Sequence, residues 1–271
     1  MKKFDPLVFI AFFVSLAILA GFAGWQYQRQ QHFKYLKSLG LHAAAVHYPE
    51  LIPEMVAIGL DVNHLDGGRT PLMNAVDFHK LESVESLLHF GADPNINTGN
   101  SINPSVLLSA TFIPNRPEDP QIIKLLLKAG ADPNARDSNN RTALIRLALN
   151  SHFLSALSIA EDLIAAGVDV NAEGTDGMTA LQYSVSTGNA ALADLLLKSG
   201  ADPEQRNRQG FRAIDQINST SKAEAIQKVF ARHGADTERR PDLIKKYREE
   251  LEKHKPEEPA TIPPADSSND N

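Results

Sequence analysis

A short segment of the form Gly-x-Asp-x-(Asn or Glu) recurs along the chain at a nearly fixed interval. Its copies occupy residues 59–63, 91–95, 130–134, 167–171, 200–204 and 234–238. Successive glycines of these copies lie 32, 39, 37, 33 and 34 residues apart. A period of this length is typical of stacked repeats, because one such unit cannot bury its apolar face alone. The pattern predicts a solenoid with an extended surface, an architecture that rarely encloses a catalytic pocket.

Composition narrows the class of protein further. The 271 residues are 42% hydrophobic and 22% charged, which is typical of a globular chain. A formal net charge of -6 argues against nucleic-acid binding, which needs a cationic surface. The chain has no cysteine, so it has no disulfide, no thiolate zinc site and no site for lipoprotein acylation.

An apolar segment near the N-terminus predicts a membrane-spanning helix. Residues 1–6 form a short tail with Lys2 and Lys3, and Leu7 to Trp25 then reads LVFIAFFVSLAILAGFAGW without a charge. As a helix, these 19 residues would be about 28 Å long, which matches the hydrocarbon core of a bilayer. Trp25 and Tyr27 stand at the far end, where amphipathic rings favour the membrane interface.

Both the cleavage of this segment and its orientation in the membrane remain open. It can instead be a secretory signal cleaved near Gly21-Phe22-Ala23, which would leave a secreted repeat protein. The positive charges on its two sides nearly balance and do not decide the orientation. Met1-Lys2-Lys3 followed by an apolar run resembles an uncleaved signal anchor, which favours a short cytoplasmic tail. In a Gram-negative source, this single-pass protein would sit in the inner membrane with its repeats in the periplasm.

The best copy of the repeat identifies a family. Residues 70–95 read TPLMNAVDFHKLESVESLLHFGADPN and closely resemble the ankyrin pattern T-P-L-H-x-A-A…V-x-x-L-L-x-x-G-A-D-x-N. Thr70 can cap the first helix, and Pro71 suits the first helical position because it has no N–H to satisfy. Gly91 suits the left-handed conformation that ends the second helix. The resemblance implies a mainly α fold of helix-turn-helix units with short β-turn fingers, which the membrane helix precedes.

The alignment divides the remaining chain. Residues 26–35 are expected to be a linker, residues 36–238 to hold about six ankyrin repeats, residues 239–254 a C-terminal helix and residues 255–271 a disordered tail. The terminal repeats are the weakest copies, as expected where one side faces solvent. The histidine of the family pattern occurs only as His42, so apolar packing is expected to replace its hydrogen bonds at Met73, Leu108, Ile145, Gln182 and Asp215.

Phe112 to Pro120 (FIPNRPEDP) is predicted to be an irregular loop between paired helices, because prolines at 114, 117 and 120 disfavour a helix. Such a loop is either functional or a tolerated insertion.

The sequence carries no catalytic or metal-binding motif. None of the patterns for phosphate-binding loops, dinucleotide sites, zinc proteases or serine hydrolases occurs. His42 and His47 lie five residues apart, which is off the spacing that places two ligands on one helix face. We therefore expect no enzyme activity, no metal, no cofactor and no small-molecule substrate.

The family resemblance implies a protein-binding surface on the concave side, formed by the first helix of each pair and by the finger tips. The positions that correspond are Asn74, Asp77, Phe78, Phe112, Arg146, Tyr183, Ser186 and Gln216 on helices, and Arg136, Asp137, Glu173, Asp176, Arg206 and Arg208 at the tips. Aromatic and arginine side chains most often anchor interfaces, which favours Phe78, Tyr183, Arg146 and Arg206, although the two aromatic rings can equally pack between repeats. We expect a membrane-tethered module that acts as an envelope scaffold, or alternatively an immunity protein that neutralises a secreted antibacterial toxin.

Overall fold

The computed structural model describes residues 6–97, 104–112, 116–150, 155–217, 220–238 and 249, with main chain alone for residues 6–23, 220 and 221. Its elements are α1 (Pro6–His47), η1 (Pro49–Leu51), α2 (Ile52–Ala57), α3 (Pro71–Asp77), α4 (Leu81–His89), α5 (Val106–Ala110), α6 (Asp119–Lys128), α7 (Ala143–Leu149), α8 (Ala156–Ala165), α9 (Ala180–Ser186), α10 (Ala190–Lys198), η2 (Ala213–Gln216) and α11 (Thr220–Arg232). The predicted C-terminal helix, apart from residue 249, and the predicted tail lie outside the described residues.

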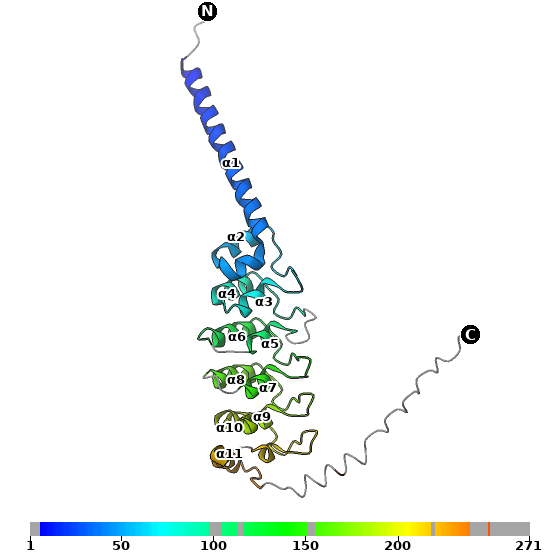
Figure 1. Ribbon diagram of the computed structural model, residues 1–271. Coiled ribbons are helices and arrows are strands. Elements are labelled where there is room, and N and C mark those ends of the chain that lie inside the picture. The colour runs from blue at the N-terminus through cyan, green and yellow to red at the C-terminus, as the bar shows by residue number, and fades with distance from the viewer. Residues whose placement is uncertain are drawn as a thin grey trace, which may run out of the picture.

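The helices form antiparallel pairs that stack in two rows, as Figure 1 shows. The first helices, α3, α5, α7 and α9, and then η2, form one row beside the fingers. The second helices, α4, α6, α8, α10 and α11, form the other row. The stack confirms the mainly α repeat architecture, and most of its contacts join a helix either to its pair or to the corresponding helix of the next pair.

The helix ends follow the local sequence as expected. Thr70 caps α3 by accepting a hydrogen bond from the Met73 amide at 3.2 Å, and Ser105, Thr142 and Thr179 cap α5, α7 and α9 in the same way. Gly91 follows α4 with φ of +85°, a left-handed conformation that favours glycine. These signals are local in the chain, so the sequence alone could place the hairpins.

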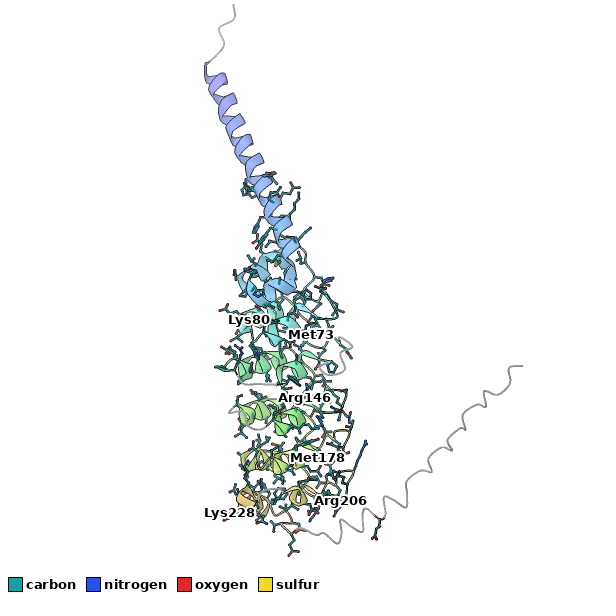
Figure 2. All side chains as sticks on the ribbon, viewed as in Figure 1. Met73, Lys80, Arg146, Met178, Arg206 and Lys228 are labelled. Atoms are coloured by element: carbon teal, nitrogen blue, oxygen red, sulfur yellow. The ribbon has the colours of Figure 1, made fainter. Side chains whose placement is uncertain are left out.

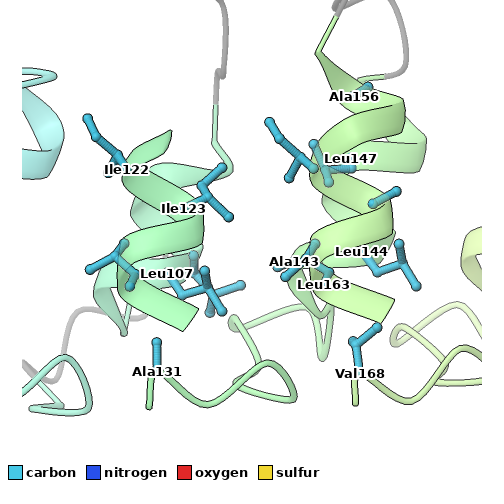
Figure 3. Close-up of a cluster of buried hydrophobic side chains, with 14 of the residues drawn as sticks. Leu107, Ile122, Ile123, Ala131, Ala143, Leu144, Leu147, Ala156, Leu163 and Val168 are labelled. Atoms are coloured by element: carbon cyan, nitrogen blue, oxygen red, sulfur yellow. The ribbon is translucent and has the colours of Figure 1, made fainter. Parts of the chain in front are cut away.

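The core runs through the stack without a break and lies between the two rows. Figure 3 shows one section of it, with Leu107, Ile122 and Ile123 on one pair and Leu144 and Leu163 on the next. All five side chains are at most 1% exposed. Complete burial of one such side chain contributes about 1.5–3 kcal/mol, so the contacts between pairs hold the stack together.

Side-chain amides of the recurrent segment join successive fingers. Asn63, Asn95, Asn134 and Asn171 each donate to the carbonyl of the next repeat's glycine and accept from the amide of the next repeat's aspartate. Glu204 stands at this position before the last helix pair and bonds instead to Arg212. We call these four asparagines the amide ladder.

Residues 26–35, expected to be a linker, are helical, because α1 continues through them to His47. The helix bends at Gly40, whose φ of 74° and ψ of 152° are not helical. Leu36 is fully buried against the stack, whereas residues 24–35 are exposed apart from the half-buried Phe33. We call residues 24–35 the stalk, and it projects from the end of the stack in Figure 1.

No helix among the described residues is long and apolar enough to span a bilayer. Most of the predicted span, Leu7 to Trp25, lies outside the residues whose side chains the structure describes, which begin at Gly24.

The loop predicted from Phe112 to Pro120 ends earlier than expected, because α6 begins at Asp119. Pro120 lies in the first turn, where a backbone N–H has no partner within the helix, so proline removes no hydrogen bond there. Residues 113–115 of this loop lie outside the described residues.

Candidate functional site

A pocket of about 290 Å³ opens between the pairs α3–α4 and α5–α6. It is lined by Val76, Asp77, His79, Ser109, Ala110, Phe112, Asp119 and Ile122. Phe78 adjoins it as the residue that ends α3. The side chains of Phe78 and Phe112 are 58% and 46% exposed, and apolar groups that gather at one hollow are typical of an interaction surface.

The turn after α3 sets one wall of the pocket. The His79 amide donates to the Val76 carbonyl at 2.9 Å, and His79 itself has a positive φ of 55°. This conformation is uncommon for a residue with a side chain. The His79 ring donates from Nδ1 to Asp119 Oδ1 at 2.5 Å, and this bond joins the turn to the start of α6.

Two carboxylates give the pocket its polarity. Asp119 is 3% exposed and also accepts from the Arg116 amide at 2.8 Å. Asp77 forms an ion pair with Arg69 and accepts a hydrogen bond from the Ser109 hydroxyl. The pocket therefore contains two carboxylates and the exposed ring of Phe112, which suits a partner that presents a hydrogen-bond donor and an apolar group.

The pocket holds serine, histidine and aspartate, but its described contacts do not join them as a nucleophile and base. The Ser109 hydroxyl donates to Asp77, whereas His79 pairs with Asp119. An activated serine requires a hydrogen bond to its base, so this arrangement does not prepare Ser109 for attack. Among the described residues, no group of three or more His, Asp or Glu side chains could hold a metal ion.

Arg146, expected to face outward, is instead 6% exposed within the stack, where Figure 2 labels it. Its Nη1 donates to the Leu108 carbonyl at 2.7 Å, its Nε lies 3.3 Å from Asp137 Oδ2, and its guanidinium stacks on Phe112. Burial lowers the pKa of Arg146, and Asp137 opposes that effect. Its position corrects the expectation of exposure, because Arg146 joins two helix pairs.

For Tyr183 the structure favours the alternative of packing between repeats, because its exposure is 7%. Its hydroxyl donates to Asp176, and the Arg141 guanidinium lies 5.9 Å from the centre of its ring. Burial, followed by the bond to Asp176, raises the pKa of Tyr183 to about 12. A ring held in this way is a packing residue and not an exposed anchor.

The predicted finger residues form hydrogen bonds within their own finger and to the next one. Arg136 Nη1 donates to the carbonyls of Asn140 at 3.0 Å and Glu173 at 3.1 Å. The Glu173 carboxylate accepts from Gln205 Nε2 at 2.5 Å. Arg206 is half-buried, and its Nη1 donates to the Gly210 carbonyl at 2.7 Å. These tips are ordered by their own contacts.

The remaining predicted positions differ in exposure. Asp77, Phe78, Phe112 and Arg208 are exposed, whereas Asn74, Ser186 and Gln216 are half-buried. Asn74 accepts from Arg69 Nε at 2.8 Å. The structure thus brings Asp77 and Phe112 together in one pocket, next to Phe78 in the chain, and leaves the other positions distributed along the stack.

Sequence reasoning missed His79, Ser109 and Asp119, which complete the pocket. They come from three separate segments that only the stacking of the pairs brings together. The sequence did contain one partial signal, namely the irregular stretch from Phe112 to Pro120, which includes Asp119.

The expected replacement of the family histidine by apolar packing is only partly correct. His42 donates to the Arg69 carbonyl at 2.9 Å, and Met73, Leu108 and Ile145 are buried apolar side chains, as expected. Gln182, however, retains the hydrogen bonds, because its Nε2 donates to the carbonyls of Gln205 at 2.9 Å and Phe211 at 3.0 Å.

Family models for ankyrin repeats match two parts of the chain. The single-repeat model matches residues 67–99, and the model for three copies matches residues 113–207. The terminal copies around Gly59 and Gly234 lie outside these ranges, so the count of six repeats stays a prediction.

Known proteins share this pattern over part of their length. The nuclear factor NF-kappa-B p105 subunit of Gallus gallus is 35% identical over 184 residues, which cover 63% of this chain and 18% of that protein. Palmitoyltransferase AKR1 of Lachancea kluyveri is 26% identical over 194 residues, which cover 67% of this chain and 25% of that protein. The chain thus spans a quarter or less of these two relatives.

A solved structure of similar size also matches. The crystal structure of an ankyrin repeat domain from Acinetobacter baumannii superposes with a TM-score of 0.63 at 29% sequence identity. The match covers 72% of this chain and 98% of that domain.

Proposed function

From the premise that this chain carries ankyrin repeats, we propose that it is a non-enzymatic module that binds a partner protein. The binding site is the pocket between α3 and α5, together with Phe78 and Phe112. One observation carries the proposal: Phe112, 46% exposed, lines a hollow that contains two carboxylates, and Phe78, 58% exposed, directly follows the lining residue Asp77. Aromatic anchors around a concave centre dominate the energetics of many interfaces.

The contacts inside the pocket support a site that is already formed before binding. Asp77 is held by Arg69 and Ser109, and Asp119 is held by His79 and the Arg116 amide. Acceptors fixed in this way lose little conformational entropy when a partner binds. The partner therefore presents an apolar group to the exposed phenylalanine and a hydrogen-bond donor to Asp77, whose side chain is 32% exposed.

A membrane tether for this module is part of the proposal. It is supported by the uncharged segment from Leu7 to Trp25, which has the length of a bilayer core. The module would then serve as an envelope scaffold that holds its partner at the membrane, with the repeats in the periplasm. Alkaline extraction of native membranes tests the tether, and recovery of the chain in the soluble fraction would contradict it.

The binding site is tested by two matched substitutions. Phe78→Ser removes an exposed ring beside the pocket, and Leu157→Ser removes an apolar side chain of α8 that is 38% exposed. Loss of an interface anchor costs at least about 2 kcal/mol, so Phe78→Ser should weaken capture of the partner by more than about tenfold. Leu157→Ser should leave capture unchanged, and both variants should melt within a few degrees of the parent chain. Equal capture by the two variants would contradict the site.

A further inference from the structure

Three side chains of the stalk form a stripe along one face of α1. Trp25, Arg29 and Phe33 are spaced four residues apart, which places them on the same side of a helix. The Arg29 guanidinium carbon lies 5.1 Å from the centre of the Trp25 ring and 5.1 Å from the centre of the Phe33 ring. Arg29 is thus held between two aromatic rings while remaining exposed.

The charge around this stripe is of one sign. Residues 6–47 contain Arg29, Lys34 and Lys37 but no Asp or Glu, whereas the whole chain has a formal net charge of -6. Residues 6–47 therefore carry a net positive charge, whereas the acidic excess lies in the rest of the chain. This distribution favours an anionic surface beside the stalk and disfavours one against the stack.

The stalk is fixed to the stack at its base. Leu36 is fully buried, and His32 Nε2 lies 3.0 Å from Glu54 Oε1 of α2. Arg29 lies four residues beyond Trp25, about 6 Å along the helix axis. With Trp25 at the end of the hydrocarbon core, that distance reaches the headgroup layer, which is about 5–8 Å thick on each side.

We propose that Trp25, Arg29 and Phe33 bind anionic phospholipid headgroups, with the Arg29 guanidinium donating to the lipid phosphate. This inference rests on the proposed membrane tether. Guanidinium groups recognise phosphate through paired N–H donors, and the flanking rings hold Arg29 in an extended position. Because α1 is cationic and the repeats are acidic, the same interaction keeps the repeats away from the lipid surface.

Trp25 is the only tryptophan of the chain and reports on its own surroundings. The experiment uses the full chain in vesicles of phosphatidylcholine and phosphatidylglycerol, with bromine on the acyl chains of one lipid at a time. Brominated phosphatidylglycerol should quench Trp25 several-fold more than the brominated zwitterionic lipid. Each Arg or Lys near an anionic surface changes lipid affinity by about fivefold, so Arg29→Gln should largely remove this preference.

A matched control lies on α1 nearer to the stack. Lys37 stands eight residues beyond Arg29, about 12 Å along the helix, which exceeds the screening length of about 8 Å in physiological salt. Lys37→Gln should therefore leave the lipid preference unchanged, and Arg29→Lys should retain part of it.

The outcomes separate the two proposals. If neither lipid quenches Trp25 and the chain does not float with vesicles, the tether is wrong and the lipid site is wrong with it. If both lipids quench equally in the parent chain, or if Arg29→Gln keeps the preference for phosphatidylglycerol, the lipid site is wrong while the tether stands.

Discussion

Asn95 Nδ2 donates a hydrogen bond of 2.8 Å to the carbonyl of Gly130, the first residue of the recurrent segment in the next repeat. The same side chain accepts from the Asp132 amide at 2.9 Å. A single amide thus satisfies two main-chain groups of its neighbour, and the amide ladder repeats this contact along the fingers. The recurrent segment that defines the period is also the segment that joins one repeat to the next.

Asn95→Ala should lower stability without changing the fold. The substitution removes two hydrogen bonds, each with a net contribution of about 0.5–1.5 kcal/mol, so we expect a loss of about 1–3 kcal/mol. Urea unfolding followed by circular dichroism measures it. Asn139→Ala is the control, because this exposed residue contributes its carbonyl to the Thr175 amide. Equal losses for the two variants would show that the ladder adds no stability.

Arg212→Met should loosen the last helix pair. Arg212 is 1% exposed and bonds to Glu204, Asp215, Asp236 and the Glu238 carbonyl. Burial disfavours its charge, but its hydrogen bonds, led by that to Asp215, outweigh burial and raise the pKa of Arg212.

Removing one member of such a buried network costs about 3–5 kcal/mol, because Asp215 then stays buried without its cation. Since repeats depend mainly on their neighbours, hydrogen exchange should accelerate most in α11. Uniform acceleration through the whole stack would contradict this expectation.

Gly177→Ala should destabilise the chain more than Gly130→Ala. Both glycines have positive φ, +73° and +87°, so both variants carry the left-handed cost of about 1–2 kcal/mol. A Cβ at Gly177 would lie 2.8 Å from the Arg208 amide nitrogen, whereas a Cβ at Gly130 meets nothing within 4 Å. We expect overpacking to add about 1–3 kcal/mol at Gly177 alone. Chemical denaturation of the two variants side by side measures the difference, and equal costs would refute the close approach of the fingers.

Asp194 should make stability depend on acidic pH. Hydrogen bonds from Lys198 and His233 lower the pKa of Asp194 from 3.8 to about 2. As pH falls below about 4, the unfolded chain takes up this proton before the folded chain does, so the contribution of Asp194 is lost towards pH 2. Asp194→Asn should be less stable at pH 7 and should show a flatter decline between pH 4 and pH 2. A decline identical to that of the parent chain would contradict the pKa shift.

Arg146→Ala should reduce stability instead of acting only on partner capture. The guanidinium and its partner Asp137 are 7% and 5% exposed, and removal of the cation leaves the carboxylate buried alone. Breaking a buried pair typically costs about 3–5 kcal/mol. Lys124→Ala, at an exposed position of α6, is the control and should change little. An unchanged melting temperature for Arg146→Ala would contradict a stabilising role for this residue.

The sequence predicts those features that depend on neighbours along the chain. Thr70 and Gly91 mark helix ends by their own chemistry, and the spacing of the glycines predicts the stack. Burial of Arg146 was not predicted and packing of Tyr183 was only one of two alternatives, because burial depends on the adjacent repeat that covers each side chain. The pocket was not predicted, because three separate segments converge to form it. The helical stalk was not predicted either, because α1 continues there through a mainly polar stretch.

Site-specific photo-cross-linking in intact cells tests the binding surface most directly. A benzophenone side chain at position 78 should give one discrete covalent adduct, and the same group at position 157 on α8 should give none. Asp77→Asn should reduce the adduct formed from position 78, because that carboxylate lines the pocket. Absence of an adduct at position 78, or adducts of equal intensity from both positions, would contradict the account.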